Sequence, residues 1–216
     1  MGSALGAGRV RNARVAKDRL AKFRARLGRF RILKKAKVST ARILKTGGIA
    51  AMVYGQETMG VADTSFLAQR RSAAAALSTR GCGDLDLSLA MADSRRGAKV
   101  DPAFAAHEGT IGAWAEAVWG GWLPLAMLKA LMAATLDSLA GMGKATWSLV
   151  KGPAAACAMT ARRLGWTTHG GLRLTTDQGE ELCCLRDSPA FVRAKVRQAV
   201  VRWRNVCIEQ RYPQLR

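Results

Sequence analysis

The chain has 216 residues and a mass of 23.2 kDa, a length that suits one large domain or two small ones. Hydrophobic residues make up 49% of the sequence, which excludes a globally disordered chain. The formal net charge of +20 is concentrated at the ends. Residues 1–45 contain 15 Lys and Arg against the single acid Asp18, residues 46–186 have a net charge of +1, and residues 187–216 have +5.

The N-terminal segment has the pattern of an amphipathic helix from Val10 to Phe30. Its apolar stripe recurs at spacings of three and four residues and consists of Ala13, Ala16, Leu20, Phe23, Leu27 and Phe30. Because so many cations with one acid exceed what solubility requires, we expect the segment to bind a polyanion, with nucleic acid favoured over anionic lipid. The predicted phosphate-binding residues are Arg9, Arg11, Arg14, Lys17, Arg19, Lys22, Arg24, Arg26, Arg29, Arg31, Lys34, Lys35 and Lys37.

A mitochondrial transit peptide is an alternative interpretation of this segment, because such peptides are also amphipathic, rich in Arg and poor in acids. The segment is poor in Ser, however, and its charge density is high even for that class. Cleavage after import would distinguish the two interpretations, since it would remove most of the cations. No signal peptide is predicted, because residues 1–45 lack a continuous apolar run.

Short helices are expected after the basic segment. One is predicted around Ser39–Leu44, and a second over 49–59 is predicted to break near Gly55 and to end at Gly60. Between them, Gly47-Gly48 is interpreted as a turn, because no Gly-Lys-Ser/Thr follows to complete a phosphate-binding P-loop.

The next helix is expected to begin at Asp63 or Thr64, to continue to Leu77, and to be followed by a loop at Gly81-Cys82-Gly83. Asp101-Pro102 predicts a helix cap followed by proline at the first helical position.

Three apolar helices are expected in the neutral middle of the chain, starting at Thr110, Pro124 and Pro153. The first has one side formed by Ile111, Trp114, Val118, Trp119 and Trp122, and the second faces a partner with Leu125, Leu128, Leu131, Met132, Leu136 and Leu139. We interpret the tryptophans as core residues and not as base-stacking platforms. The longest charge-free apolar run, 117–128, is too short for the roughly twenty residues of a spanning helix, so no membrane partner is predicted.

The pattern changes near the C-terminus. Alternating apolar and polar residues over 172–185, with Gly179 in the turn, predict a β-hairpin. Ser188-Pro189 then predicts the start of a final helix, whose basic edge of Arg193, Arg197 and Arg204 is a second candidate phosphate-binding surface.

Catalytic patterns are missing from the sequence. Two-metal phosphoryl transfer requires paired carboxylates, and Asp84 and Asp86 have no further acid nearby in the sequence. We interpret His107-Glu108 as a pair at a helix end and His169 as a turn residue. Asp63, Asp93 and Asp101 are interpreted as caps or loop residues. A Cys–His nucleophile pair is left open, because such partners meet only in the fold. We expect no enzyme activity, no metal site and no cofactor for this chain.

The cysteines indicate reduced thiols in an intracellular compartment, nuclear or cytoplasmic. The chain has five of them, an odd number: Cys82, Cys157, Cys183, Cys184 and Cys207. Their spacing shows no disulfide framework and no Cys-x-x-Cys motif, and the adjacent pair Cys183-Cys184 has poor geometry for a mutual bridge. With only His107 and His169 besides, no zinc pattern can be assembled.

Several clusters of residues resemble one family. They are Lys45-Thr46-Gly47-Gly48-Ile49-Ala50-Ala51-Met52-Val53-Tyr54-Gly55-Gln56, Gly60-Val61, Leu67-Ala68-Gln69-Arg70-Arg71, Asp84-Leu85-Asp86-Leu87, Asp101-Pro102-Ala103-Phe104-Ala105-Ala106-His107, Arg163-Leu164-Gly165-Trp166 and Val201-Arg202-Trp203-Arg204. From about Arg19 to Leu215, the chain resembles the region that follows the reverse-transcriptase palm in non-LTR (LINE-type) retrotransposon polyproteins. The resemblance implies a helical, thumb-like region plus a connecting domain. It also implies packing against an upstream polymerase domain that holds the catalytic aspartates.

The sequence as a whole therefore predicts a mainly α fold: a helical, bundle-like domain with a basic N-terminal helix and one small β-hairpin. The predicted segments are a basic helical segment (1–45), short thumb-like helices (46–80), a neutral α-rich domain (81–186) and a basic C-terminal helix (187–216). The expected function is non-catalytic, largely sequence-independent binding of RNA or DNA through phosphate contacts. The alternative is a helical interaction or scaffold protein with a mitochondrial-type targeting N-terminus.

Overall fold

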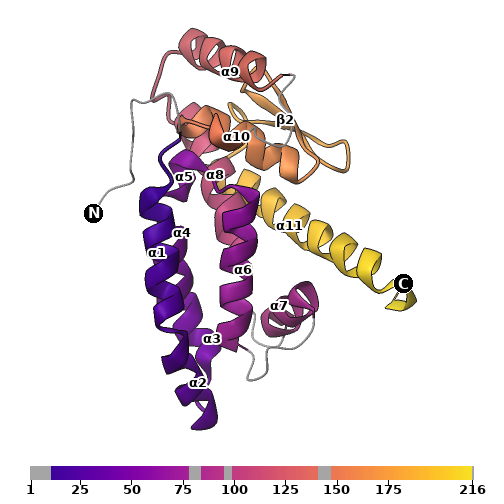
Figure 1. The fold of residues 1–216 in the computed structure, drawn as a ribbon. Helices are drawn as coiled ribbons and strands as arrows, with labels where there is room; N and C mark the ends of the chain where they lie inside the picture. The colour runs from indigo at the N-terminus through magenta and orange to yellow at the C-terminus, as the bar shows by residue number, and fades with distance from the viewer. Residues whose placement is uncertain (1–10, 78–83, 95–98, 141–146, 216) are drawn as a thin grey trace.

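A computed structural model of the chain describes residues 11–77, 84–94, 99–140 and 147–215. The fold is mainly α-helical, with a small antiparallel sheet near the C-terminus, which confirms the predicted fold class (Figure 1). The helical elements are α1 (Arg14–Ala25), α2 (Leu27–Lys35), α3 (Thr40–Ile43), the π-helical turn η1 (Leu44–Ile49), α4 (Ala50–Val53), α5 (Gln56–Met59), α6 (Asp63–Leu77), α7 (Leu85–Ser94), α8 (Pro102–Trp119), α9 (Leu125–Leu139), α10 (Gly152–Arg163), α11 (Pro189–Arg211) and the 3₁₀ turn η3 (Pro213–Leu215). The strands are β1 (Thr167–His169), β2 (Arg173–Thr175) and β3 (Glu181–Cys183).

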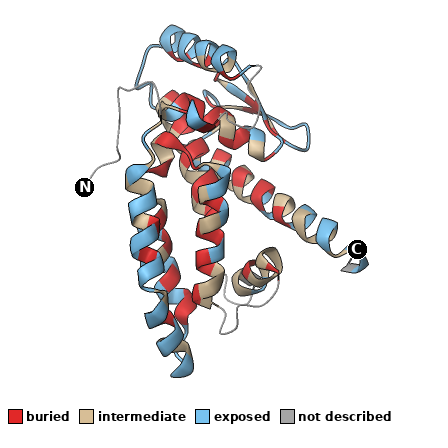
Figure 2. Cartoon of the chain, in the orientation of Figure 1, coloured by how far each residue is buried: buried red, intermediate tan, exposed pale blue. Residues whose placement is uncertain are grey.

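The basic N-terminal segment is part of the folded core. Leu20, Phe23 and Phe30 are buried in one hydrophobic cluster with residues of the following helices, among them Leu44 and Met52. α1 and α2 lie alongside α4 and α6, and their outward faces are exposed (Figures 1 and 2). The apolar stripe of the sequence therefore docks onto protein, as its periodicity indicates.

The prediction of one continuous helix from Val10 to Phe30 is wrong, because the structure has two helices here, α1 and α2. The described helix begins at Arg14 and is interrupted at Arg26, whose amide donates to the carbonyl of Phe23 at 2.9 Å, three residues back instead of four. The ring centroids of Phe23 and Phe30 are 5.7 Å apart, and both rings pack in the same cluster on either side of this interruption.

The centre of the molecule is α8, which packs against α5, α10 and α11. Asp101 caps it, accepting from the amide of Ala103 at 2.9 Å, with Pro102 at the first helical position as predicted. The helix is continuous to Trp119, so the separate start predicted at Thr110 is wrong: the Thr110 hydroxyl donates to the Ala106 carbonyl within the helix instead. α11 crosses α8 closely at Gly112, where an added Cβ would lie 2.3 Å from the Arg193 Nε.

The tryptophans divide between core and surface. Trp114 is buried and its indole N–H donates to the carbonyl of Gly171 at 2.7 Å, and Trp147 and Trp166 are also buried. Trp119 and Trp122 are 49% and 70% exposed, so the prediction that the tryptophans are core residues is wrong for these two. They lie at the end of α8 and in the turn that follows, where no described element covers them.

Helix α9 lies at the edge of the fold, packed mainly on α10 (Figure 1). Leu128, Met132 and Leu139 face the core, whereas Leu125 and Leu131, predicted on the same side, are exposed. The apolar content of α9 is therefore greater than its contact with the core requires.

The sheet has one strand more than the predicted hairpin. β2 and β3 form that hairpin, with Gly179 in the left-handed conformation (φ 77°) in the turn, and β1 pairs antiparallel with β2. Leu174 and Leu182 point from neighbouring strands into the main core. His169, predicted in a turn, is the last residue of β1 and forms hydrogen-bonded contacts with Thr167 and Thr175.

Four cysteines are free in the described part of the chain: Cys157, Cys183, Cys184 and Cys207. Burial raises the pKa of the Cys157 thiol, and burial together with Cys183 and Asp187 raises the pKa of Cys184 to about 12. Both groups are therefore neutral thiols at physiological pH and poor nucleophiles. Cys82 and the loop predicted around it lie outside the described residues. Among the described helices, none combines the length and apolarity needed to cross a bilayer.

Candidate nucleic-acid interface

The outward face of α1 and α2 consists mainly of cations. Burial of Leu20, Phe23 and Phe30 on one side turns the charged positions between them toward solvent (Figure 2). Eight of the predicted phosphate-binding residues are exposed here and have no ion-pair partner among the described residues: Arg14, Lys17, Lys22, Arg26, Arg29, Arg31, Lys35 and Lys37. We call these eight residues the basic face. The one acid in α1, Asp18, is exposed and forms no ion pair with any described residue.

Four other predicted residues of the segment have contacts within the protein. Arg11 donates to the carbonyl of Gly60 and lies over the Trp147 ring, and Arg19 donates to the carbonyl of Tyr54. The Arg24 Nε donates to the Ser72 hydroxyl at 3.2 Å.

Lys34 also belongs to this group, because its Nζ donates to the Ala75 carbonyl at 3.1 Å. Partial burial, together with repulsion by Arg31, lowers the pKa of Lys34. These contacts fasten α1 and α2 to the neighbouring helices. Arg9 lies outside the described residues.

The basic edge predicted on α11 is occupied by carboxylates. Arg193 donates to Glu116 at 2.8 Å and Arg197 to Glu108 at 2.6 Å, so a phosphate would have to compete for both. The side chain of Arg204 is 7% exposed and pairs with Asp93, which removes it from any phosphate-binding surface. The sequence did not predict this pairing, because helical spacing does not reveal partners more than a hundred residues away.

A groove runs along the inner border of the basic face. It has a volume of about 360 Å³ and lies between the α1–α2 pair and the segment formed by α3, η1 and α4. Its charged lining residues are all cations, and its other lining residues are apolar or glycine: Arg19, Lys22, Arg26 and Arg29, with Phe23, Phe30, Leu33, Ile43, Gly47, Gly48 and Ala51. The groove therefore combines a positively charged rim with an apolar floor.

The far wall of the groove adds cations that the sequence prediction left out. Ile43 and Gly47 line this wall. Arg42 and Lys45, which are close to them in the sequence, are exposed. Gly48 is needed for the close packing of this wall, because an added Cβ would lie 2.8 Å from the Phe23 ring. Both cations belong to the same basic segment, residues 1–45, so a prediction based on the charge density of the whole segment would have included them among the phosphate-binding residues.

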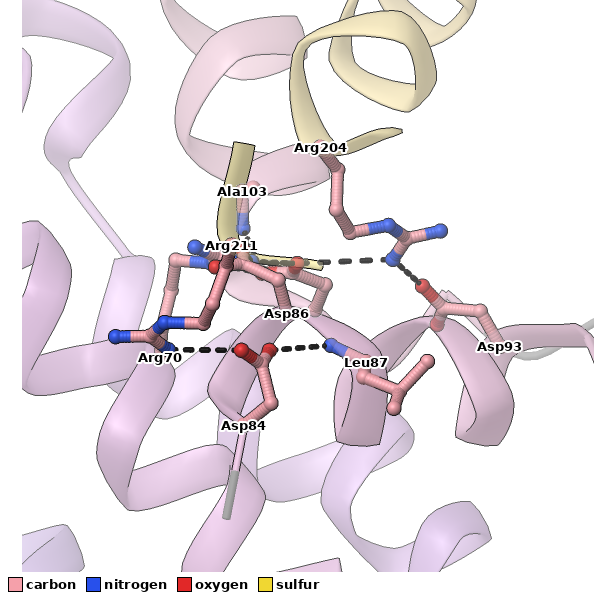
Figure 3. Close-up of polar contacts among 9 residues, drawn as sticks. Arg70, Asp84, Asp86, Leu87, Asp93, Ala103, Arg204 and Arg211 are labelled. Carbon is pink, nitrogen blue, oxygen red and sulfur yellow. Dashed lines mark hydrogen bonds and ion pairs between the residues drawn. The ribbon is translucent and has the colours of Figure 1, made fainter. Parts of the chain in front are cut away.

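A buried ion cluster joins α6, α7, α8 and α11 on another side of the fold (Figure 3). Arg70 is at its centre: its guanidinium pairs with Asp101 at 2.8 Å and with Asp86 at 2.6 Å. Burial alone would lower the pKa of Arg70, but the hydrogen bonds and charges of the two carboxylates outweigh it, and the pKa is raised. We call Arg70, Asp84, Asp86, Asp93, Asp101, Arg204 and Arg211 the ion cluster.

The remaining acids of the cluster are also matched by cations. Asp84 accepts from the Leu87 amide and from Arg211, both at 2.8 Å, and despite burial these contacts lower its pKa. Asp93 pairs with Arg204, but burial outweighs this contact and raises its pKa. The structure therefore adds Asp93 and Asp101 to the Asp84/Asp86 pair, which the sequence could not do. Among the described residues, however, no group of three or more His, Cys, Asp and Glu side chains is placed to hold a metal ion.

His107 is a buried core residue, not the helix-end residue predicted. It lies within α8, fully buried, with its Nδ1 2.7 Å from the Ala103 carbonyl and its ring 5.4 Å from the Phe66 ring. Burial and the nearby Arg163 lower the pKa of His107 to about 3. Its Nε2 has no hydrogen-bond partner among the described residues.

This depressed pKa predicts a pH-dependent stability. Above the ordinary pKa of 6.5, the His107 imidazole is neutral in both the folded and the unfolded chain, and the fold has its full stability. As the pH falls from 6.5 toward the folded pKa of about 3, the unfolded chain takes up the proton first, so the stability of the fold is lost. We expect the free energy of unfolding to fall by up to about 1.4 kcal/mol per pH unit in this window. Urea unfolding at several pH values measures it. His107→Gln should lack this slope between pH 6.5 and 5, whereas the exposed His169→Gln should keep it, and equal slopes would contradict the assignment.

Residues of the resembling clusters meet in space. Asp84, Asp86, Asp101 and Arg204 belong to the ion cluster, and the His107 and Trp203 rings are 6.1 Å apart beside it. Their arrangement holds four helices together. Comparison of the chain with protein-family models, with curated proteins and with solved structures finds no match.

Proposed function

We propose that this chain binds nucleic acid through its phosphates, with little dependence on base sequence. The observation that supports the proposal best is the basic face: eight exposed cations, on two docked helices and the turn after α2, that have no ion-pair partner in the part of the chain that the structure describes. Because the helices are already packed on the core, binding does not have to order them. Cations in such an arrangement neutralise phosphates and release condensed counterions.

The composition of the face supports binding without sequence readout. α1 and α2 contain no Asn or Gln, the side chains that most often form paired hydrogen bonds with adenine. Lys and Arg on a helix reach phosphates readily, and phosphate contacts position a nucleic acid without specifying its sequence.

We further propose that the chain is non-catalytic and derives from the region after the palm of a retrotransposon reverse-transcriptase polyprotein. The resembling clusters span most of the chain, and in this fold their aspartates are paired with arginines in the ion cluster. A carboxylate paired in this way has a structural role that does not require a metal ion. A polymerase domain upstream would then supply the chemistry.

The alternative, a scaffold protein with a removable targeting segment, is supported less well. Leu44, Met52 and Ala73 are fully buried in the hydrophobic cluster to which α1 and α2 contribute Leu20, Phe23 and Phe30. Removal of α1 and α2 would therefore uncover this cluster. A segment that completes the core in this way is costly to remove.

The dependence of affinity on salt tests the proposal. If about six cations of the basic face reach phosphates, the slope of log affinity against log salt should be about −5 on duplex DNA and about −4 on single strands. Fluorescence anisotropy with two labelled oligonucleotides of unrelated sequence measures both slopes, and the two sequences should bind equally. A slope near zero, or a strong preference for one sequence, would contradict the proposal.

A further inference from the structure

We infer that the groove beside the basic face takes the bases of a single-stranded nucleic acid while its phosphates lie on the cationic rim. This inference rests on the proposed nucleic-acid binding and adds the class of ligand. The groove does not extend the charge pattern alone, because Phe23, Phe30, Leu33 and Ile43 also line it. A surface that bound phosphates only would have no use for an apolar floor in the middle of its cations.

The chemistry of the lining selects among ligands. The groove has no carboxylate, amide or hydroxyl side chain, so it offers no side-chain acceptor for base edges, and its side-chain donors are the cations of its rim. A ligand that fits it is anionic at its border and uncharged, flat and apolar in its interior. Unstacked bases meet that description, and their burial against apolar side chains tolerates any sequence. Duplex DNA does not, because its bases remain stacked and expose only their edges in the grooves, so no base face can pack on the apolar lining.

The cations beyond the groove favour a nucleic acid over an acidic peptide. Arg14 and Lys17 continue the basic face past one end, and Arg31, Lys35 and Lys37 continue it past the other. A polyanion with a charge at every repeat can use all of these positions. An acidic amphipathic helix would use only those at the rim.

A stacking platform lies at one end of the groove. Arg19, a lining residue, has its guanidinium carbon 4.8 Å from the centroid of the Tyr54 ring, and that ring is 57% exposed. The ring is held in place by the guanidinium and has exposed surface for a base. Arg–aromatic pairs of this kind are common where single strands bind.

Binding measurements with an oligothymidylate and an abasic strand of the same length test the inference, because the two have the same phosphates. The oligothymidylate should bind about fivefold more tightly or better, the factor that corresponds to one buried base. A duplex of the same length should gain nothing from the groove. Equal affinities for the two single strands, with a steep salt dependence retained, would overturn the inference and leave the proposed function standing. Absence of salt-dependent binding to any of them would overturn both.

Two glycine variants locate the effect. An added Cβ at Gly47 meets no atom within 4 Å, so Gly47→Leu should fill the groove without disturbing the fold or any charge. Gly28→Leu is the matched control, because Gly28 is also helical, exposed and open, and does not line the groove. We expect Gly47→Leu to bring the oligothymidylate to the affinity of the abasic strand and Gly28→Leu to leave the difference unchanged.

Polyglutamate as a competitor distinguishes the peptide alternative. Because polyglutamate competes only through its charge, the concentration that displaces the abasic strand or the oligothymidylate should be the same for the wild type and for Gly47→Leu. Tighter binding of an acidic helical peptide than of the oligothymidylate, lost in Gly47→Leu, would assign the groove to a protein partner. A preference for the oligothymidylate that survives Gly47→Leu would place the bases elsewhere. Either result would overturn the inference.

Discussion

Replacing Arg70 with methionine is expected to reduce the free energy of unfolding by about 3–5 kcal/mol, the usual effect of leaving a buried charge without its partner. The Asp101 side chain is fully buried, and Arg70 supplies its two closest cationic contacts, while Arg204 is 3.6 Å away. Asp86 would also lose its only described ion pair. Since methionine fills a similar volume, the effect would come from the unpaired carboxylates and not from a cavity.

The next residue in the sequence provides the control. Arg71 is exposed and has no ion-pair partner among the described residues, so Arg71→Met should change the free energy of unfolding by about half a kcal/mol or less. Adding Asp101→Asn to Arg70→Met should restore part of the loss, because Asn removes the charge and still caps α8. Urea unfolding followed by circular dichroism gives the free energy of unfolding of the wild type and of the three variants. Similar losses for Arg70→Met and Arg71→Met would show that the ion cluster does not stabilise the fold.

Local signals in the sequence predicted the local structure. Asp101-Pro102 and Ser188-Pro189 cap α8 and α11 as expected, and Gly55 and Gly60 interrupt and end the short helices. These predictions succeed because caps, prolines and glycines act through their own backbone and a few neighbours. The start predicted at Thr110 fails for the complementary reason: packing of α8 on three helices continues it through a residue of only modest helix propensity.

Pairing between distant residues could not be predicted in the same way. A basic edge at helical spacing on α11 resembles a solvated surface, yet Arg204 pairs with Asp93, Arg197 with Glu108 and Arg193 with Glu116. Equally, Asp84 and Asp86 lack an acidic neighbour in the sequence, and the fold brings Asp93 and Asp101 to them. The basic face differs because the chain has 35 Lys and Arg against 15 Asp and Glu, and the first 45 residues contain only one of these acids, so few carboxylates are close in the sequence to its cations.

Removing four cations of the basic face should weaken nucleic-acid binding by roughly a thousandfold at 0.1 M salt, if all four reach phosphates. The variant combines Lys22→Gln, Arg26→Gln, Arg29→Gln and Arg31→Gln, which are exposed and unpaired among the described residues. Each phosphate contact on duplex DNA contributes about 0.9 to the salt slope, so the slope should become flatter by three to four units. The fold should be retained, because none of the four belongs to the buried stripe.

A control with the same loss of charge separates contact from the general field of a basic protein. Lys129→Gln, Arg162→Gln, Arg173→Gln and Arg186→Gln remove four exposed cations from α9, α10, β2 and the segment before α11, and α9, α10 and β2 lie at the end of the molecule away from α2 (Figure 1). Charges that only attract a polyanion at a distance are screened within about 10 Å at 0.1 M salt. The control should therefore change the salt slope little. If both quadruple variants flatten the slope equally, the phosphates do not lie on α1 and α2, and binding reflects the net charge of the chain.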